Sequence, residues 1–426
     1  MTHFGMLCPA LPGHLNPMMA LGRELKRRGH DLTFFQIPDV KSKILAEGFN
    51  FHPIGQDVYP PGSLKKFLAH LGKLKGPPAI IYWHQDHQQV AGVVCRDAPK
   101  AIQKAGVEAL LIDQLEPGGA AVAERLQLPF ITICNALALN REPGIPPIFT
   151  HWVYQEASWV HLRNQVASYL SDLTVQPFHV VVARYRRQWK LPPLKGSDIF
   201  FANSQLAQIS QQPTTFDFPR QFLPKCFHYT GPWRNQSAQV VPFPWERLTD
   251  KPLIYASLGT LQISKYDVFH CIAAACEPLD VQLVITHGGG MNEEQAQKLP
   301  GSPLVVSYAP QLEVLAKATL AITHAGLNTV LDALSYGVPL VAIPITFEQP
   351  GIAARLQWTG AGQMLPVSRL SVSRLRTAIQ QVLTEKSYRQ NAERLRDSLR
   401  QAGGVVQAAD IVERVIETGK PVLADN

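Results

Sequence analysis

A strand followed by a tight turn and a helix, over residues 320–337, is the feature that most constrains the fold of this chain. Residues 320–323 form a short apolar run that predicts a strand, and Gly326 supplies backbone freedom for the turn. Apolar residues then recur at helical spacing from Leu327, and Gly337 marks the end of the helix. The start of such a helix offers unpaired N–H groups and a positive dipole end to an anion. The sequence therefore predicts an α/β fold with an anion-binding turn.

Polar side chains around this turn suit a nucleotide sugar. His324 at the strand end, with Asn328 and Thr329 in the helix, can donate hydrogen bonds to a diphosphate. Asp332, one helical turn further, can accept from ribose hydroxyls as acidic residues do in other nucleotide-binding folds. Each residue also has a plainer explanation, because Thr329 and Asp332 fit a capping box and a lone histidine is more often a core residue. The joint arrangement favours diphosphate and ribose binding.

The wider stretch of residues 308–349 carries YAPQ at its start, HAGLNTVLD in its middle and the pair Glu348-Gln349 at its end. It resembles the nucleotide-sugar signature of the glycosyltransferases that include the plant secondary-product, macrolide and UDP-glucuronosyl transferases. The resemblance implies the GT-B fold, an α/β architecture in which two Rossmann-like domains face one another across a cleft. The donor contacts that it implies are Tyr308, which would stack on the uracil, the Ala309 backbone at the base, Gln311 and Asp332 at the ribose, His324, Gly326, Asn328 and Thr329 at the diphosphate, and Glu348 and Gln349 at the sugar.

Three departures from the plant members leave the identity of the sugar open. Asp332 and Glu348 reverse the usual lengths of the two acids, and Leu327 replaces a tryptophan. The segment between Leu315 and His324 is also two residues shorter. The expected donor is a UDP-hexose, with glucose favoured, because Asp332 and Gln311 are placed for a ribose with both hydroxyls.

A second glycine turn follows the apolar strand pattern that starts at residue 251. In the resembling family this loop caps the diphosphate with backbone N–H groups and hydroxyls, which implies contacts from Ser257, Gly259 and Thr260. As an isolated string it is a weak signal, since any strand-to-helix turn uses such residues. The later run of three glycines at 288–290 is interpreted as a plain βα turn.

The N-terminus predicts a strand–helix–strand unit and hence a parallel sheet. Residues 3–9 and 31–37 are the expected strands. Asn16 and Pro17 predict the helix start, with Asn as the N-cap and Pro at the first helical position, and Gly29 ends the helix. One face of that helix is apolar: Met18, Leu21 and Leu25.

His14 lies in the loop outside the carboxyl end of the first strand, where open α/β sheets bind ligands. Asp113 ends a buried-looking strand, and together they suggest a general base held by a carboxylate. Taken singly, such an Asp is more often a loop or cap residue, and such a His is ambiguous. Residues 12–17, PGHLNP, match the GHxxP motif of the resembling family, whose histidine is the catalytic base, and Asp113 matches its supporting acid. The first forty residues look closest to the bacterial carotenoid (zeaxanthin) glucosyltransferases and the related macrolide group.

A chain of 426 residues suits two domains of about two hundred residues each. The expected division is an acceptor-binding domain over 1–235, a linker over 236–251, a nucleotide-sugar domain over 252–400 and a C-terminal helix within 401–426. By resemblance that last helix crosses back onto the first domain. Residues 141–194, rich in proline and aromatic residues, have two interpretations, a substrate pocket or plain core. Residues 199–204, IFFANS, predict a return to strand.

Composition limits the cellular compartment and the binding partners that we expect. The cysteines show no metal-ligand spacing, there is no signal peptide and no apolar run of about eighteen residues, so a reduced cytoplasmic protein is expected. The net charge of +7 suits an anionic partner, and a nucleotide diphosphate is favoured over nucleic acid because no nucleic-acid motif is present. The basic, aromatic stretch 184–190 has two interpretations, contact with the inner face of an anionic membrane or a solvated helix face. A monomer or weak dimer is expected.

The predicted reaction is a single inverting displacement that moves a hexose from the UDP-sugar to a hydroxyl of an apolar acceptor such as a carotenoid, polyketide or flavonoid. No cofactor and no metal ion are expected, because fixed donors replace a divalent cation and no DxD-type acidic cluster occurs. Two alternatives stay open. A nucleotide-sugar epimerase shares the fold but needs no His14–Asp113 pair, and a catalytically silent helper protein would be expected to have lost these residues.

Overall fold

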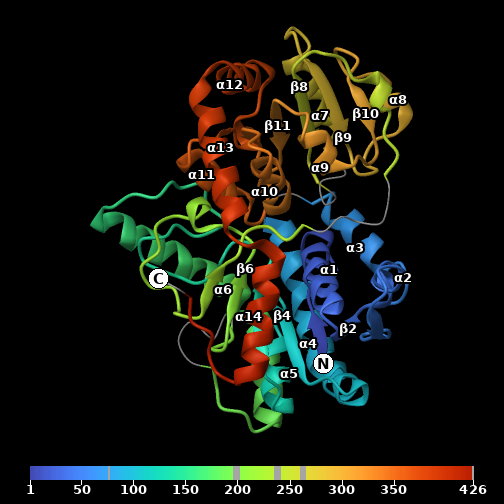
Figure 1. The fold of residues 1–426 in the computed structure, drawn as a ribbon, viewed down its shortest axis with the longest axis vertical. Helices are drawn as coiled ribbons and strands as arrows, with labels where there is room; N and C mark the ends of the chain where they lie inside the picture. Colours follow the sequence, from blue (N-terminus) through green and yellow to red (C-terminus); the bar gives the residue numbers. More distant parts are fainter. Residues whose placement is uncertain (75–76, 195–201, 235–240, 260–264, 425–426) are drawn as a thin grey trace.

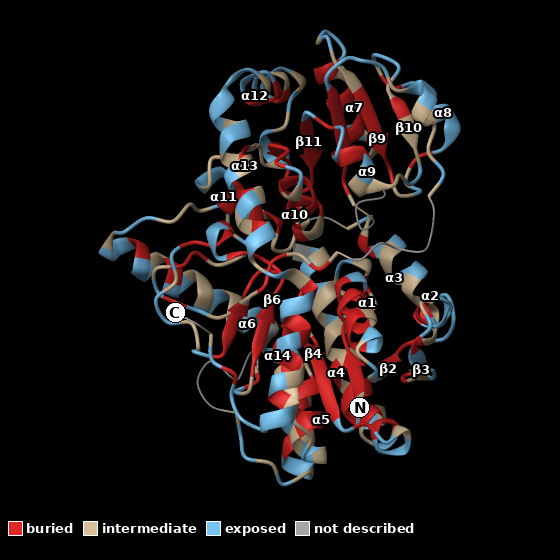
Figure 2. Ribbon diagram, viewed as in Figure 1, coloured by how far each residue is buried: buried red, intermediate tan, exposed pale blue. Residues whose placement is uncertain are grey.

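The computed structural model of the protein contains two β-sheets in which every strand pair is parallel. It describes residues 1–74, 77–194, 202–234, 241–259 and 265–424. The two sheets lie one above the other along the long axis of the molecule, each with helices packed against it (Figure 1). The inner strands of both sheets are almost wholly buried, and the edge strands are partly exposed (Figure 2). Two Rossmann-like units of this kind confirm the predicted α/β, GT-B architecture.

The first sheet has the order β3-β2-β1-β4-β5-β6-β7. Its strands are β1 His3–Leu7, β2 Asp31–Gln36, β3 Asn50–Pro53, β4 Ala109–Asp113, β5 Phe130–Cys134, β6 Gln208–Ser210 and β7 Phe227–Tyr229. The helices of this half are α1 Pro12–Arg27, α2 Lys41–Ala46, α3 Ser63–Leu71, α4 Pro77–Ala105, α5 Gly119–Leu126 and α6 Ser158–Gln188, with short 3-10 helices at Pro38–Val40 and Thr214–Phe216.

The second sheet has the order β10-β9-β8-β11-β12-β13. Its strands are β8 Leu253–Ser257, β9 Gln282–Thr286, β10 Leu304–Val306, β11 Leu320–Thr323, β12 Leu340–Ala342 and β13 Gly362–Met364. The helices that follow them are α7 Tyr266–Cys276, α8 Glu293–Gln297, α9 Gln311–Leu315, α10 Leu327–Ser335, α11 Gln349–Trp358, α12 Val372–Thr384 and α13 Lys386–Gln401, with 3-10 helices at Trp245–Arg247 and Val367–Arg369.

The last helix, α14 (Gly404–Thr418), lies against α1 on the first sheet (Figure 1). Its apolar side joins the core of that half through residues such as Val412, which packs among the side chains that α1 buries. Arg28, just after α1, binds Asp410 and Glu413 of α14 at 2.6 Å each. The chain therefore begins and ends on the same half of the molecule.

Two predicted elements of the first half are wrong. Helix α1 begins at Pro12 rather than at Asn16, so Pro17 lies inside it. Pro17 has no N–H to donate to the Gly13 carbonyl. The helix tolerates this because that carbonyl accepts a hydrogen bond from Asn328 instead. The strand predicted at 199–204 falls partly outside the described residues. Its described part, 202–204, is not a strand, and β6 forms at Gln208–Ser210 instead.

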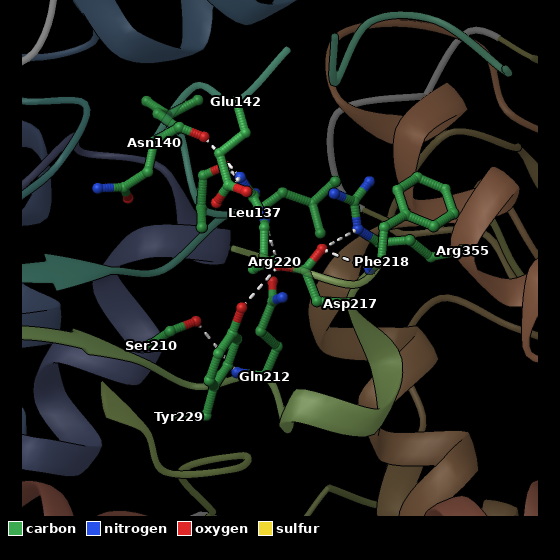
Figure 3. Close-up of polar contacts among 12 residues, drawn as sticks. Leu137, Asn140, Glu142, Ser210, Gln212, Asp217, Phe218, Arg220, Tyr229 and Arg355 are labelled. Carbon is green, nitrogen blue, oxygen red and sulfur yellow. Dashed lines mark hydrogen bonds and ion pairs between the residues drawn. The ribbon is translucent and has the colours of Figure 1, made fainter. Parts of the chain in front are cut away.

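A buried ion cluster joins the two halves (Figure 3). Asp217, from the first half, accepts from Arg355 Nε of α11 at 2.7 Å, from Arg220 Nε at 3.0 Å and from the Tyr229 hydroxyl at 2.8 Å. The Arg355 guanidinium also lies 4.3 Å over the ring of Phe218. Burial raises the pKa of Asp217, but the charges of Arg355 and Arg220 outweigh it and hold that pKa well below its usual range. The cluster fixes α11 against the first half of the chain.

All six cysteines lie in the described part of the chain and are unpaired, and Cys271 is the one that is not fully buried. None of the helices among the described residues combines the length and the apolar character that a membrane span requires.

Candidate active site

His14 and Asp113 meet at the carboxyl ends of the strands of the first sheet. His14 lies in the first turn of α1, and Asp113 is the last residue of β4, the neighbour of β1. His14 Nδ1 lies 2.8 Å from Asp113 Oδ2, and the side chain of Asp113 is fully buried while that of His14 keeps 12% exposure. With Nδ1 engaged, the Nε2 atom of His14 remains for a substrate proton. The structure thus brings together the two residues predicted as a dyad.

Two neighbours of the dyad were not identified from the sequence. Asn135, just after β5, donates from Nδ2 to Asp113 Oδ2 at 2.6 Å, and the Leu115 N–H donates to Asp113 Oδ1 at 2.8 Å. These donors fix the carboxylate that orients His14. Glu116 is buried one turn beyond Asp113, and its Oε1 atom has no hydrogen-bond partner among the described residues. The one sequence signal for Glu116 was its position three residues after Asp113, the acid at the strand end.

The C-terminal half faces this dyad through Glu348. Burial lowers the pKa of His14, but the charge and hydrogen bond of Asp113, assisted by Glu348 and Glu116, outweigh it and raise that pKa above its usual value. Burial raises the pKa of Glu348, while the nearby His14 lowers it. An electrostatic effect of this kind requires the two side chains to lie close together. Together with the hydrogen bond from Asn328 to the Gly13 carbonyl at 2.9 Å, this places the two predicted half-sites beside one another.

His324 lies between the two glycine turns of the second half. A Cβ atom added at Gly259 would lie 2.7 Å from the His324 ring, and one added at Gly326 would lie 2.6 Å from it. Gly326 has φ −68°, and the left-handed residue of the turn is Ala325 at φ +66°, so the prediction that Gly326 supplies backbone freedom is wrong. Glycine is needed there for space. Thr260, predicted with Ser257 at the diphosphate, lies outside the described residues.

The alternative explanation of Thr329 and Asp332 as a capping box is excluded. The N-cap of α10 is Gly326, without a side-chain cap, and both residues lie inside the helix. Asn328, in its first turn, reaches across to the other half: its Nδ2 donates to the Gly13 carbonyl at 2.9 Å. Gly13 is the acceptor that Pro17 leaves without a helical N–H. The start of α10 therefore lies directly beside His14.

The residues predicted for the ribose contact one another. Gln311 Nε2 donates to Asp332 Oδ2 at 2.6 Å, and Gln311 Oε1 accepts from the Tyr255 hydroxyl at 3.2 Å. Arg234, which the sequence reasoning missed, forms an ion pair with Asp332 Oδ1 and donates to the Asn328 carbonyl at 3.1 Å. The only sequence signal for Arg234 is its position at the end of the first half.

The residues predicted to hold the base and the sugar flank this group. Tyr308 is 57% exposed and donates to the Gly288 carbonyl, so its ring is open to a stacking partner, and Ala309 is half-buried beside it. Gln349 Oε1 accepts from the Ile345 and Thr346 N–H groups at 2.9 Å each. Its amide nitrogen is consequently the atom that can meet a sugar hydroxyl.

Comparison with known proteins identifies the family of the chain. The family model described as "UDP-glucoronosyl and UDP-glucosyl transferase" matches residues 81–401. The chain belongs to this family. It is 38% identical to the zeaxanthin glucosyltransferase of Pantoea ananas over 100% of this chain and 98% of that protein. It is 35% identical to the zeaxanthin glucosyltransferase of Pseudescherichia vulneris over 99% of this chain and 100% of that protein.

Solved structures show the same fold. The calicheamicin glycosyltransferase CalG4 superposes with a TM-score of 0.76 at 21% sequence identity, covering 99% of this chain and 100% of CalG4. The protein is therefore a glycosyltransferase of the GT-B fold, as predicted. In the part of the chain that the structure describes, no group of three or more His, Cys, Asp and Glu side chains is arranged to hold a metal ion.

Beside the dyad, the glycosyltransferase has a pocket that is partly open to solvent. Its walls come from the ends of β1 and β2, from α3 and α4, and from the loop after β4, and they are mostly apolar, with Phe35, Ile54, Phe67, Trp83 and Val93. The ring of Phe347, just before Glu348, lies 4.5 Å from that of Trp83. The pocket in the first half therefore adjoins the predicted sugar turn of the second.

The prediction that residues 141–194 build a substrate pocket does not hold for this cavity, because none of them lines it. The first half of α6 instead exposes apolar side chains to solvent, including Trp159, Leu162 and Tyr169. The loop before it packs on α11, where the Gly351 N–H donates to the Ile148 carbonyl at 2.9 Å. This region contributes to the contact between the halves.

Proposed function

We propose that this glycosyltransferase moves glucose from UDP-glucose to a hydroxyl of a large apolar molecule, of the carotenoid, polyketide or flavonoid kind. The observation that carries the proposal is the His14–Asp113 hydrogen bond beside a mostly apolar pocket. Full-length similarity to two zeaxanthin glucosyltransferases supports both the sugar and the apolar acceptor. An epimerase would need neither the dyad nor the pocket, and a silent helper protein would need no hydrogen-bonded base.

In the proposed reaction His14 Nε2 removes the proton from the acceptor hydroxyl. The acceptor oxygen then forms a bond to the anomeric carbon as the bond from that carbon to the diphosphate oxygen breaks, and the configuration inverts. UDP leaves with the bonding electron pair. Asp113 stabilises the imidazolium that forms.

The donor is held by the second half. Tyr308 and the Ala309 backbone bind the base, and Gln311 and Asp332 bind the ribose. The diphosphate binds at the start of α10, where Gly326, Asn328 and Thr329 lie, and at His324 and the turn of Ser257, Gly259 and Thr260. Glu348 and Gln349 bind the sugar. Because burial lowers the pKa of His324 to about 4, it acts as a neutral hydrogen-bond donor, and the helix dipole supplies positive potential.

We place the enzyme in the cytoplasm, where UDP-sugars and apolar acceptors at the inner face of a membrane are both within reach. One residue of the basic stretch 184–190 has a structural role, because Arg186 forms a two-point ion pair with Glu124. Arg184, Arg187 and Lys190 remain exposed. A solvated helix face is therefore our interpretation of this stretch.

Incubation of the purified protein with UDP-glucose and a panel of apolar alcohols tests the function. We expect release of UDP that depends on the acceptor, and a glucoside of inverted configuration by mass spectrometry and NMR. Turnover should persist in excess EDTA, since the proposed donors neutralise the leaving group themselves. A product epimeric in the sugar alone, or no reaction with any donor, would contradict the proposal.

The packing around His324 gives a sharper test of the donor site. Gly326→Ala should push the imidazole away from its place, because the new Cβ would lie 2.6 Å from Nε2 while the backbone, at φ −68°, accepts alanine. Loss of one hydrogen bond to a charged diphosphate corresponds to about 1.5–3 kcal/mol. We expect the dissociation constant of UDP, measured by calorimetry, to rise accordingly. Gly92→Ala, whose Cβ makes ordinary contact with Val181, is the matched control, and equal UDP affinity in both variants would refute the assignment.

A further inference from the structure

A buried carboxyl group with one oxygen unpartnered among the described residues lies in the wall of the pocket, close in sequence to the dyad acid Asp113. Glu116 lines the pocket together with Leu115 and Leu11. Its backbone N–H donates to the Asp113 carbonyl at 2.9 Å, which places it one turn from the dyad acid. The residue is 6% exposed, and its Oε1 atom makes no hydrogen bond within the described residues. A buried polar atom of this kind is costly unless a ligand satisfies it.

When ionised, Glu116 is among the causes that raise the pKa of His14, and protonated His14 in turn lowers the pKa of Glu116. Burial and the charge of Asp113 nevertheless raise the pKa of Glu116 to about 8. At neutral pH the group is therefore mainly a carboxylic acid, with an O–H to donate, set in an apolar wall beside the base.

We propose that Glu116 binds the acceptor hydroxyl: its carboxylic O–H donates a hydrogen bond to the acceptor oxygen while His14 removes the proton from that oxygen. The inference rests on the proposed function and adds a residue to it. Glu116 keeps its own proton throughout, the acceptor proton goes to His14 Nε2, and the oxygen lone pair forms the bond to the anomeric carbon. A neutral carboxylic acid in an apolar site is an effective donor to a developing oxyanion.

This arrangement selects for the chemical class of the acceptor. A phenol, with a pKa of about 10, gives up its proton readily, whereas an aliphatic alcohol holds its proton far more tightly. A donor that stabilises the developing alkoxide therefore matters most for aliphatic alcohols. The pocket and Glu116 together point to a large apolar molecule with an aliphatic hydroxyl as the substrate.

The pH dependence can be assigned to Glu116 because its titratable neighbours are few. Cys8, Cys95 and Tyr59 have pKa values that burial raises above the working range, so they stay neutral. Asp86 and His87 also line the pocket, and their pKa values of about 6 and about 4 mean that both have titrated well below pH 8. Loss of the His14 proton increases activity because His14 acts as a base, so we assign a decline in alkaline solution to ionisation of Glu116. Glu116→Gln tests that assignment against ionisation of Glu348, whose pKa burial also raises. Transfer should therefore fall as the pH rises through about 8.

Two variants test the proposal, and steady-state kinetics with one aliphatic alcohol and one phenol gives the readout. Glu116→Leu should lower kcat for the aliphatic alcohol on the order of 10²-fold, and less for the phenol, because one donor to the oxyanion is lost. Glu116→Gln keeps an N–H donor that does not ionise, so it should retain most of the rate and lose the alkaline decline. Glu417→Leu, an exposed glutamate on α14, is the control.

The outcomes separate this inference from the proposed function. Wild-type turnover that Glu116→Leu leaves intact for both acceptors, or an alkaline decline that survives in Glu116→Gln, overturns the role of Glu116 while the transferase activity stands. An absence of wild-type turnover overturns the proposed function itself. UDP binding by calorimetry shows whether each variant is folded, and Glu116→Gln keeps the proposal falsifiable if the leucine variant does not fold.

Discussion

Replacing His14 with alanine should lower kcat for glucosyl transfer by about 10²- to 10⁴-fold, the range expected for loss of a general base. UDP should bind with near wild-type affinity, because the proposed nucleotide contacts come from the other half of the molecule. Steady-state kinetics and calorimetry with UDP measure the two effects separately. Near-normal transfer by His14→Ala would remove His14 from its role. His270→Ala, an exposed histidine on α7, is the control.

The pH profile gives the same hypothesis a second test. Transfer needs His14 without its proton, so kcat/KM should rise with pH through the pKa of His14. Asp113 and the other nearby carboxyl groups raise that pKa, which places the acidic limb above the usual value of 6.5. In Asp113→Asn the neighbouring charge is lost, so the limb of the residual activity should move to lower pH. If the acidic limb of the pH profile does not move, Asp113 does not raise the pKa of His14.

The β11–α10 unit was predicted correctly because local sequence decides it. Residues 320–323 are apolar, the next apolar residues follow the helical period, and strand, turn and helix form as expected. The contact between His14 and Asp113 also followed from topology, since β1 and β4 are neighbours and their carboxyl ends meet at one edge.

The missed features depend on contacts between distant segments. Both Pro12 and Pro17 suit a helix start, and the helix accepts Pro17 because Asn328, more than three hundred residues away, bonds the Gly13 carbonyl. The glycine at 326 looked like a turn residue, whereas its reason is the ring of His324 packed against it. No local pattern contains this information.

The prediction of short polar elements failed for a related reason. Strand β6, Gln208–Ser210, has no apolar alternation, and its burial comes from β5, β7 and the C-terminal segment around it. The hydrophobic run at 199–204 was the stronger local signal, and its described part, residues 202–204, is not a strand. Asn135 and Arg234 were missed because each acquires its role from a carboxylate that the fold brings to it.

Breaking the ion cluster between the two halves should cost far more stability than breaking an exposed ion pair. Asp217→Asn removes the negative charge that faces Arg355 and Arg220, and both arginines stay buried, since their side chains are 1% and 5% exposed. Breaking a buried ion pair by removing one partner costs about 3–5 kcal/mol. Glu142 lies 3.6 Å from Arg220 and offsets part of the loss, but it does not reach Arg355. Denaturant unfolding, monitored by fluorescence, measures the free energy.

The way in which this stability contribution changes with pH follows from the pKa of Asp217, which is lowered in the folded state. Its stabilising contribution is complete above the pKa of an unfolded aspartate and is lost as the pH falls below it. The difference in stability between wild type and Asp217→Asn should therefore shrink in acid. Glu393→Gln, which breaks the exposed Arg389–Glu393 pair on α13, should cost at most about 0.5 kcal/mol. If the two substitutions cost the same, the cluster would be no more than a surface contact, and the position of α11 against the first half would need another cause.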